Sequence, residues 1–283
     1  VVKEKEKYMI RLGVRGHDLP GKTLEEFVAT MEKYPKLSHI QFAPMKSFPN
    51  IFTSSDKLSP GLALYVQEIL GKHNLSISIL GCYLNIMQFE EKPELKKTFF
   101  DYMLYTRAFG SEVIATETGS VGKGYTPDNF TEEAFQKALR IIEEMAVQAE
   151  KTGVILGIEP GINHPLCSIK KARRMLEAIP INNLRILLDI ANLITPENVD
   201  HQETLIEEAF ETLGPWICHC HLKDFVLENG KIKAVPFGTG QLQIPKYLSA
   251  IQAYKPYCNC TFEATKEDGI EHAIHITEQF IVN

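Results

Sequence analysis

Short apolar, β-branched runs alternate with amphipathic stretches eight times along the 283 residues of the chain. Each run has the length of a strand, and the stretch after it has helical periodicity, as in Thr23–Tyr34 with its Thr23-x-x-Glu26 capping box. Eight such units predict an α/β fold, a closed (β/α)8 TIM barrel. The predicted strands are Met9–Val14, Ser38–Phe42, Leu75–Leu80, Glu112–Ala115, Val154–Ile158, Arg185–Leu188, Trp216–Cys220 and Asn259–Phe262.

A doubly wound open sheet is the alternative architecture for the same alternation. Its dinucleotide-binding members carry a Gly-x-Gly-x-x-Gly turn after the first strand, and Gly13-Val14-Arg15-Gly16-His17 does not match that pattern. No linker, low-complexity tract or shift in composition divides the chain. We therefore predict a single barrel domain over residues 1–283.

A carboxylate or an imidazole stands at the end of each of the last four predicted strands. A polar group at the end of an apolar strand is costly to bury unless it has a partner. Because the loops after the strands form the catalytic face of a TIM barrel, we expect these side chains to converge there. Their order predicts a site for one divalent metal ion, with the ligands Glu159, Asp189, His221 and Glu263.

Side-chain alternation separates the histidines from the cysteines on the seventh predicted strand. His219 and His221 share one face, and Cys218 and Cys220 share the other. We expect the histidines to point into the barrel and the cysteines to pack outward against helices, which argues against a zinc knuckle in this segment. His219 is then either a group that orients a ligand such as Glu159 or a core histidine.

The composition argues against several classes of protein. A net charge of −6 does not favour a general nucleic-acid binder, which needs a basic face. No apolar run approaches the ~20 residues of a membrane-spanning helix. Six cysteines without a Cys-x-x-Cys motif indicate reduced thiols rather than a disulfide framework. We expect a cytoplasmic protein that binds neither nucleic acid nor a membrane.

Five short motifs carry a resemblance to a known family. They are GIEP at Glu159, LLDIANL at Asp189, HCHLKD at His221, the FGTGQL loop and TFEAT at Glu263. Together they resemble the xylose isomerase-like TIM-barrel superfamily, and more closely its sugar phosphate isomerase/epimerase branch. That branch includes ketose 3-epimerases, inosose dehydratases and 3-dehydroshikimate dehydratases. The resemblance spans nearly the whole chain and is specific for the fold and the metal site rather than for the substrate.

The resemblance implies that the four strand-end residues ligate the metal and that Glu159 and Glu263 are the catalytic acid and base. An oxygen-rich ligand set with one imidazole suits Mn²⁺, Mg²⁺ or Co²⁺, with Zn²⁺ as a further candidate. The implied activity is that of a metal-dependent isomerase or epimerase of a sugar or sugar phosphate, working by proton transfer α to a metal-bound carbonyl. A dehydratase of a cyclic polyol or hydroxy-ketone and a non-catalytic sugar-binding barrel are the alternatives.

Two positions depart from the ketose 3-epimerases. Asn192 stands where those enzymes usually have a sugar-contacting His, and Lys223 and Asp224 follow the metal His where a Glu and then an Arg are usual. These departures weaken the prediction of a free-ketose 3-epimerase. We expect Lys223 and Asn192 to contact the substrate and Asp224 to pair with Lys223. The type IV apurinic endonucleases need further His and Asp ligands, which we do not find.

Loops after other strands supply the remaining candidate residues. Glu117, His164 and His17 are further predicted substrate contacts. The Gly238-Thr239-Gly240 turn offers backbone amides to a phosphate, or it is only a structural turn. The long loop Ala43–Lys57, with Phe48 and Phe52 among its residues, is expected to cover a pocket, and Gly119–Asn129 is a glycine-rich loop. The expected positions of the other histidines are on the surface or on helices: His39, His73, His201, His272 and His275. By analogy alone, a homodimer is the expected assembly.

Overall fold

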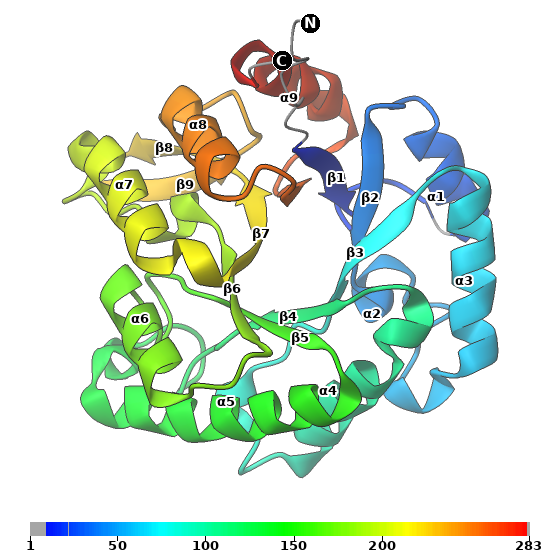
Figure 1. The fold of residues 1–283 in the computed structure, drawn as a ribbon, viewed down its shortest axis with the longest axis horizontal. Helices are drawn as coiled ribbons and strands as arrows, with labels where there is room; N and C mark the ends of the chain where they lie inside the picture. The colour runs from blue at the N-terminus through cyan, green and yellow to red at the C-terminus, as the bar shows by residue number, and fades with distance from the viewer. Residues whose placement is uncertain (1–9, 22, 282–283) are drawn as a thin grey trace, which may run out of the picture.

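The computed structural model describes residues 10–21 and 23–281. Parallel strands close into a barrel in the order β1-β10-β7-β6-β5-β4-β3-β2, in which neighbours are hydrogen-bonded. The helices surround this barrel on its outside (Figure 1). The predicted TIM barrel is confirmed. Its strands are β1 (Arg11–Arg15), β2 (Leu37–Phe42), β3 (Ser76–Gly81), β4 (Val113–Glu117), β5 (Ile155–Glu159), β6 (Leu184–Leu188), β7 (Ile217–Leu222) and β10 (Asn259–Phe262).

Helices occupy the predicted amphipathic stretches, and their ends shift by a few residues. Thr23 caps the first helix by accepting a hydrogen bond from the Glu26 amide. The first predicted strand began at Met9, which lies outside the described residues. The domain limits of 1 and 283 stay a prediction. The helices are α1 (Leu24–Met31), α2 (Pro44–Ser47), α3 (Pro60–Lys72), α4 (Pro93–Tyr105), α5 (Glu132–Thr152), α6 (Ile169–Ala178), α7 (Gln202–Leu213), α8 (Ile244–Tyr254) and α9 (Glu267–Phe280).

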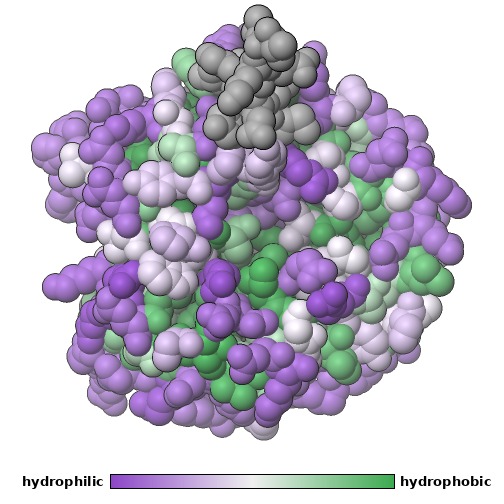
Figure 2. Space-filling view, in the orientation of Figure 1, coloured by the Kyte–Doolittle hydropathy of each residue, from purple (hydrophilic) through white to green (hydrophobic). Residues whose placement is uncertain are grey.

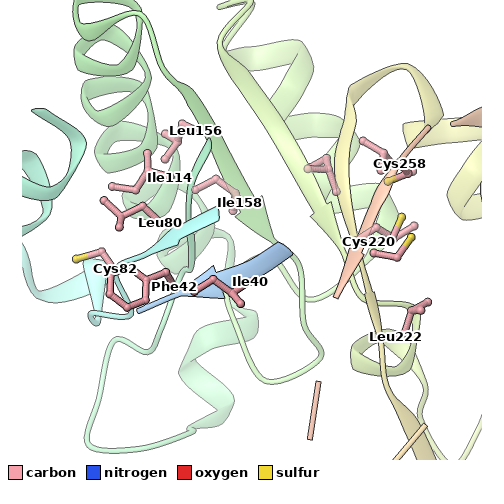
Figure 3. Close-up of a cluster of buried hydrophobic side chains, with 14 of the residues drawn as sticks. Ile40, Phe42, Leu80, Cys82, Ile114, Leu156, Ile158, Cys220, Leu222 and Cys258 are labelled. Carbon is pink, nitrogen blue, oxygen red and sulfur yellow. The ribbon is translucent and has the colours of Figure 1, made fainter. Parts of the chain in front are cut away.

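The main core lies between the barrel and its helices. Alternate side chains of the strands point outward, so Ile40, Leu80, Ile114 and Leu156 are fully buried and gather in one cluster (Figure 3). Burying an aliphatic side chain of this kind contributes about 1.5–3 kcal/mol. Seen from outside, hydrophilic residues cover most of the rim (Figure 2). This core fixes the strands, and through them the positions of the strand ends.

The barrel interior holds a histidine that was expected on the surface or on a helix. His39 is fully buried, and its Nε2 contacts the backbone oxygen of Arg11 at 3.1 Å. Gly13 makes room for it, because a Cβ on Gly13 would lie only 2.2 Å from His39 Nδ1. The prediction for His39 was wrong because its strand, β2, shows an inward face at that position and a register shift against β1.

A second departure concerns Cys218. The pairing of β6 with β7 shifts register between Ile186 and Leu187, so that Cys218 and His219 together oppose Leu187. Cys218 packs against the apolar cluster inside the barrel, near Gly157, instead of outward. The other cysteine of this strand, Cys220, is buried outside the barrel as expected. All six cysteines of the chain are free thiols.

A hairpin follows β7 before the chain returns to the barrel. Its strands β8 (Asp224–Glu228) and β9 (Lys231–Val235) pair in antiparallel fashion. Asn229 and Gly230 at its tip have φ values of 53° and 71°, as a two-residue turn with two left-handed positions requires. Asn-Gly is the residue pair that such a turn favours. Among the helices of the described ranges, none is long and apolar enough to cross a membrane.

We predict that Gly13→Ala destabilises the fold by about 3 kcal/mol, because the new methyl group would occupy the position of the His39 ring. Gly71→Ala in α3 is the matched control, since nothing lies within 4 Å of a Cβ at that position. It should stabilise the fold by about 0.5–1 kcal/mol. Urea unfolding followed by circular dichroism measures both. A Gly13→Ala variant as stable as the parent would contradict the packing described here.

Candidate metal centre

The four strand-end residues meet at one end of the barrel. Glu159 is the last residue of β5, Asp189 follows β6, His221 lies on β7 and Glu263 follows β10. One ligand atom from each lies within 4.8 Å of the others, in a cluster that could hold a metal ion. Glu159, Asp189 and His221 are each at most 2% exposed. The structure thus brings together the ligand set that the strand ends predicted.

The imidazole of His221 is oriented by a residue on the opposite side of the barrel. Its Nε2 lies 2.6 Å from Gln41 Oε1, so the ring donates its Nε2 proton to that carbonyl oxygen. Nδ1 then faces Glu263 Oε2 at 2.8 Å and Glu159 Oε1 at 3.2 Å. The Gln41 amide group in turn donates to the Tyr83 hydroxyl. This chain fixes which nitrogen is directed at the carboxylates.

The crowding of three carboxylates shifts the pKa values of the groups in the cluster. Burial, together with the charges of Glu263 and Glu159, outweighs the neighbouring Lys223 and raises the pKa of Asp189 to about 6. Burial alone would lower the pKa of His221, but the two glutamates outweigh it and raise the value to about 10. The His221 ring therefore carries a proton between the carboxylates when no other cation is there. A bound divalent cation would take the place of that proton.

Lys223 is a second internal cation of the cluster. Its ammonium group lies 2.7 Å from Asp189 Oδ2, 3.0 Å from Glu263 Oε1 and 2.6 Å from Asn192 Oδ1. Burial disfavours the charged ammonium, but the carboxylates outweigh burial and hold the pKa of Lys223 above its usual value. Asn192 completes the connection, because its amide group donates to Glu159 Oε1 at 2.7 Å.

Arg15 holds Glu263 from the other side. Its guanidinium contacts Glu263 Oε1 at 2.9 Å and binds both carboxylate oxygens of Asp18, at 2.7 and 2.9 Å. Asp18 also accepts a hydrogen bond from the amide of Ala264, whose φ of 55° is in the left-handed region. The carboxylate of Glu263 is thus fixed with Oε1 toward two cations and Oε2 toward His221. Although burial opposes it, these cations hold the pKa of Glu263 well below its usual range.

This donor set fits a divalent ion. Three carboxylates and one imidazole nitrogen, with a charge excess that calls for a cation, are the ligands expected for Mn²⁺, Mg²⁺ or Zn²⁺. Each ligand has a further partner that orients it: Gln41 on His221, Asn192 on Glu159, Lys223 on Asp189 and Arg15 on Glu263. Such outer contacts fix the geometry of a metal site.

Of the two roles left open for His219, its contacts match the core histidine, whereas Asp224 does not pair with Lys223 as predicted. His219 Nε2 contacts Thr261 Oγ1 at 2.7 Å, and Glu159 is oriented by Asn192 instead. Burial lowers the pKa of His219 well below its usual value, so this ring is a neutral core histidine. The carboxylate of Asp224 points away from Lys223 and accepts backbone hydrogen bonds from Phe225, Gly238, Gly240 and Leu242.

Two cavities adjoin the cluster. One, of about 190 Å³, is lined by Asn192 and Lys223 together with residues of the β8–β9 hairpin. The other, of about 270 Å³, is lined by Lys46, Tyr83 and residues of the Gly119–Asn129 loop. The shared wall of the two cavities consists of Glu117, Tyr125 and His164.

The predicted substrate contacts Glu117 and His164 lie in this wall, whereas His17 does not line either cavity. His17 packs edge-on against Tyr83, with ring centroids 6.2 Å apart. Burial and the adjacent Arg15 lower its pKa to about 4. In the Ala43–Lys57 loop, Phe48 and Phe52 are buried in the core, and Lys46 reaches the second cavity.

Sequence reasoning missed Gln41 and Tyr83 and left Arg15 without a role. Gln41 is fully buried on β2, between the apolar residues Ile40 and Phe42. A buried polar side chain flanked by apolar residues is a signal that could have found it. Tyr83 follows the end of β3, as Asp189 and Glu263 follow β6 and β10, but no feature of the sequence distinguishes it from a core aromatic.

Comparison with known proteins places the chain in a family. A sequence profile described as xylose isomerase-like TIM barrel matches residues 37–279. The chain belongs to this family. No curated protein matches it.

Several solved structures share the fold. One is described as a D-tagatose 3-epimerase-like protein, with 16% identity, a TM-score of 0.72 and 96% of this chain and 97% of that chain covered. Another is the probable 3-DHS dehydratase involved in petrobactin synthesis from Bacillus anthracis, with 13% identity, a TM-score of 0.71 and 95% and 99% covered. A third is the IOLI protein with a bound zinc atom, with 18% identity, a TM-score of 0.71 and 96% and 98% covered. At these identities the likeness concerns the fold alone.

We predict that metal binding releases a proton from His221 and weakens as the pH falls. The pKa of about 10 means that at pH 7 a cation must displace a proton from Nδ1. The apparent affinity for Mg²⁺ should therefore drop about tenfold for each pH unit below that value. Calorimetric titration at pH 7 in two buffers of different ionisation enthalpy counts the protons released. Metal binding without proton release would contradict the proposed protonation of His221. The control is His272→Gln at the surface, which should release as many protons as the parent protein.

Proposed function

We propose that the protein is a divalent-metal-dependent isomerase or epimerase that acts on a sugar by proton transfer at the carbon next to a carbonyl. The observation that supports this most is the placement of Glu159 and Glu263. Their carboxylates come from different strands and face the same Nδ1 atom of His221, at 3.2 and 2.8 Å. Two carboxylates that meet at one point can remove a proton and return one to the same carbon.

The proposed roles of the residues follow from their contacts. A bound divalent ion would polarise the substrate carbonyl and stabilise the negative charge that develops on its oxygen. Glu263 is held ionised by His221, Lys223 and Arg15, so it is free to accept a proton, although the same cations make it a weaker base than an ordinary carboxylate. Glu159, which accepts a hydrogen bond from Asn192, is the partner that returns the proton. Lys223 supplies a further positive charge beside the reacting carbons.

A dehydratase is the second candidate, and one feature of the cavities favours it. His164 Nε2 lies 3.8 Å from Glu117 Oε2 in the shared wall, and Glu117 pairs with Glu159 across strands β4 and β5. Such a pair could protonate a hydroxyl that leaves from the carbon next to the enolate. Removal of the proton is common to both reactions, and formation of a conjugated enone that absorbs in the ultraviolet distinguishes them.

We predict that Glu263→Gln leaves the protein folded and lowers turnover by about 10²–10⁴-fold, because the amide cannot accept the proton. The assay is proton NMR in D₂O with Mg²⁺-loaded protein and a panel of ketoses, keto-sugars and inososes, in which loss of the signal next to the carbonyl reports proton removal. The control is Glu267→Gln. Glu267 lies on α9, away from the metal centre, and forms an ion pair with Lys33. Exchange at the parent rate in Glu263→Gln would refute the assigned role.

We predict that Lys223→Met raises the affinity for Mn²⁺ at least about tenfold and lowers turnover. The ammonium contacts two of the four ligands, so its charge competes with a divalent ion for them. Without metal the variant should lose about 3–5 kcal/mol of stability, because the buried Asp189 and the partly buried Glu263 both lose a partner. Calorimetry with Mn²⁺ alone and thermal unfolding measure the two effects.

Lys46→Met is the control for this substitution, since Lys46 lies over the Tyr83 ring and contacts none of the four ligands. It should leave Mn²⁺ affinity unchanged. If Lys223 had only a structural role, Lys223→Met would instead distort the ligands and bind Mn²⁺ more weakly than the parent protein.

A further inference from the structure

We propose that the substrate of this site is an uncharged glycoside with two rings rather than a sugar phosphate, and that its second ring packs on Tyr125. The proposal rests on the proposed function, because the reacting sugar must lie at the metal centre. Its grounds are that the anion donors near the site are already occupied, that two cavities adjoin the metal centre, and that an exposed tyrosine stands between them.

The turn that could have bound a phosphate is occupied by a side chain of the protein itself. Asp224 Oδ2 accepts the amide hydrogens of Gly238 at 3.2 Å and Gly240 at 2.8 Å, and Oδ1 accepts those of Phe225 and Leu242. Asp224 is 1% exposed. A phosphate at this turn would have to displace a buried carboxylate and would also be repelled by it.

The basic side chains near the site are occupied as well. Lys223 contacts three oxygens, and Arg15 is divided between Asp18 and Glu263. Among the residues that line the two cavities, Lys46 is the cation that contacts a ring rather than a carboxylate, with its ammonium 4.3 Å from the centre of the Tyr83 ring. Phosphate sites usually combine several charged or backbone donors. The cavities therefore favour a neutral, hydroxyl-rich ligand.

Both cavities border residues next to the metal centre. Glu117 lines both of them and pairs with Glu159 on the neighbouring strand. The first is also lined by Asn192 and Lys223, which contact Glu159, Asp189 and Glu263. The second lies further from the ligands, because its lining residue Tyr83 is linked to His221 only through Gln41. At about 190 and 270 Å³, each is smaller than the ~300–1,000 Å³ that is typical of ligand pockets, and together they fall within that range. A ligand that occupies both has one ring on each side of the shared wall.

Tyr125 is the element of that wall with the greatest exposure. It is 62% exposed, and its ring lies edge-on to His164 with centroids 5.3 Å apart. An exposed aromatic ring at a cavity rim offers an apolar face to the C–H groups of a sugar ring. Phe130 directly follows the Gly119–Asn129 loop that contains Tyr125. It is 50% exposed and lines neither cavity. It is therefore a matched control for loss of an exposed aromatic from this segment.

The test compares three ketoses that differ only at O6: D-fructose, D-fructose 6-phosphate and isomaltulose, which carries a glucosyl group there. Binding to the Mg²⁺-loaded protein is measured by calorimetry, and saturation-transfer NMR reports which ring is contacted. We expect isomaltulose to bind at least about tenfold more tightly than fructose, with transfer to both rings. We expect the phosphate to give no gain over fructose. Tighter binding of the phosphate, or no binding of isomaltulose at ~10 mM, would overturn the proposal.

The variants locate the second ring. Tyr125→Ala should lower isomaltulose affinity about tenfold and leave fructose affinity within about twofold, since only the second ring loses its contact. Tyr125→Phe should retain most of the affinity, and Phe130→Ala should match the parent protein. An equal loss for both sugars in Tyr125→Ala would mean that Tyr125 shapes the reacting site instead, and would overturn the proposal.

Proton exchange in D₂O separates this inference from the proposed function. In one outcome, isomaltulose binds more tightly than fructose and this preference depends on Tyr125, but no carbon-bound proton exchanges. This result would support a binding site for the second ring on Tyr125 and would count against the isomerase or epimerase assignment. In the other outcome, fructose exchanges a carbon-bound proton but isomaltulose binds no more tightly. This result would support the isomerase or epimerase assignment and overturn the site for the second ring.

Discussion

Three carboxylates, two of them buried and the third partly so, and one imidazole have ligand atoms within 4.8 Å of one another, and this crowding is the constraint on which the rest of the site depends. In an interior of low dielectric constant, such a group is stable only if positive charge is held beside it. His221, Lys223 and Arg15 supply that charge in three directions. The cluster therefore holds cations, and its central nitrogen and oxygens lie close enough together that they could hold a metal ion.

The fixed positive charges also determine how each ligand is presented. Glu263 shows this most clearly, because Arg15 and Lys223 both contact Oε1 and leave Oε2 facing His221. The supporting residues lie on strands or directly after them, where the outer core limits movement. A site in which every ligand has a second partner loses little order when it exchanges a proton for a metal ion.

The sequence predicted the barrel and the four strand ends because both are local patterns: an apolar run, a helix after it, and one polar group at the boundary. The partners of those groups come from distant segments and could not be predicted in the same way. Gln41, which orients His221, is 180 residues away in the chain. The alternation of side chains along a strand also fails as a guide at the bulge near Cys218. Sequence adjacency failed for Lys223 and Asp224, because the Asp224 side chain points away to the Gly238–Leu242 segment.

Asp224 illustrates how a structural contact can decide what a shared scaffold binds. Its carboxylate ties the start of the β8–β9 hairpin to the Gly238–Leu242 segment, and Gly240 is required there because a Cβ would lie 2.2 Å from the Phe225 oxygen. The same four hydrogen bonds remove the backbone amides that a phosphate would need. They also fix the hairpin whose residues Ile232 and Ala234 line the first cavity. The barrel places the four candidate ligands together, whereas this one buried carboxylate lines the first cavity and occupies the backbone amides of the turn.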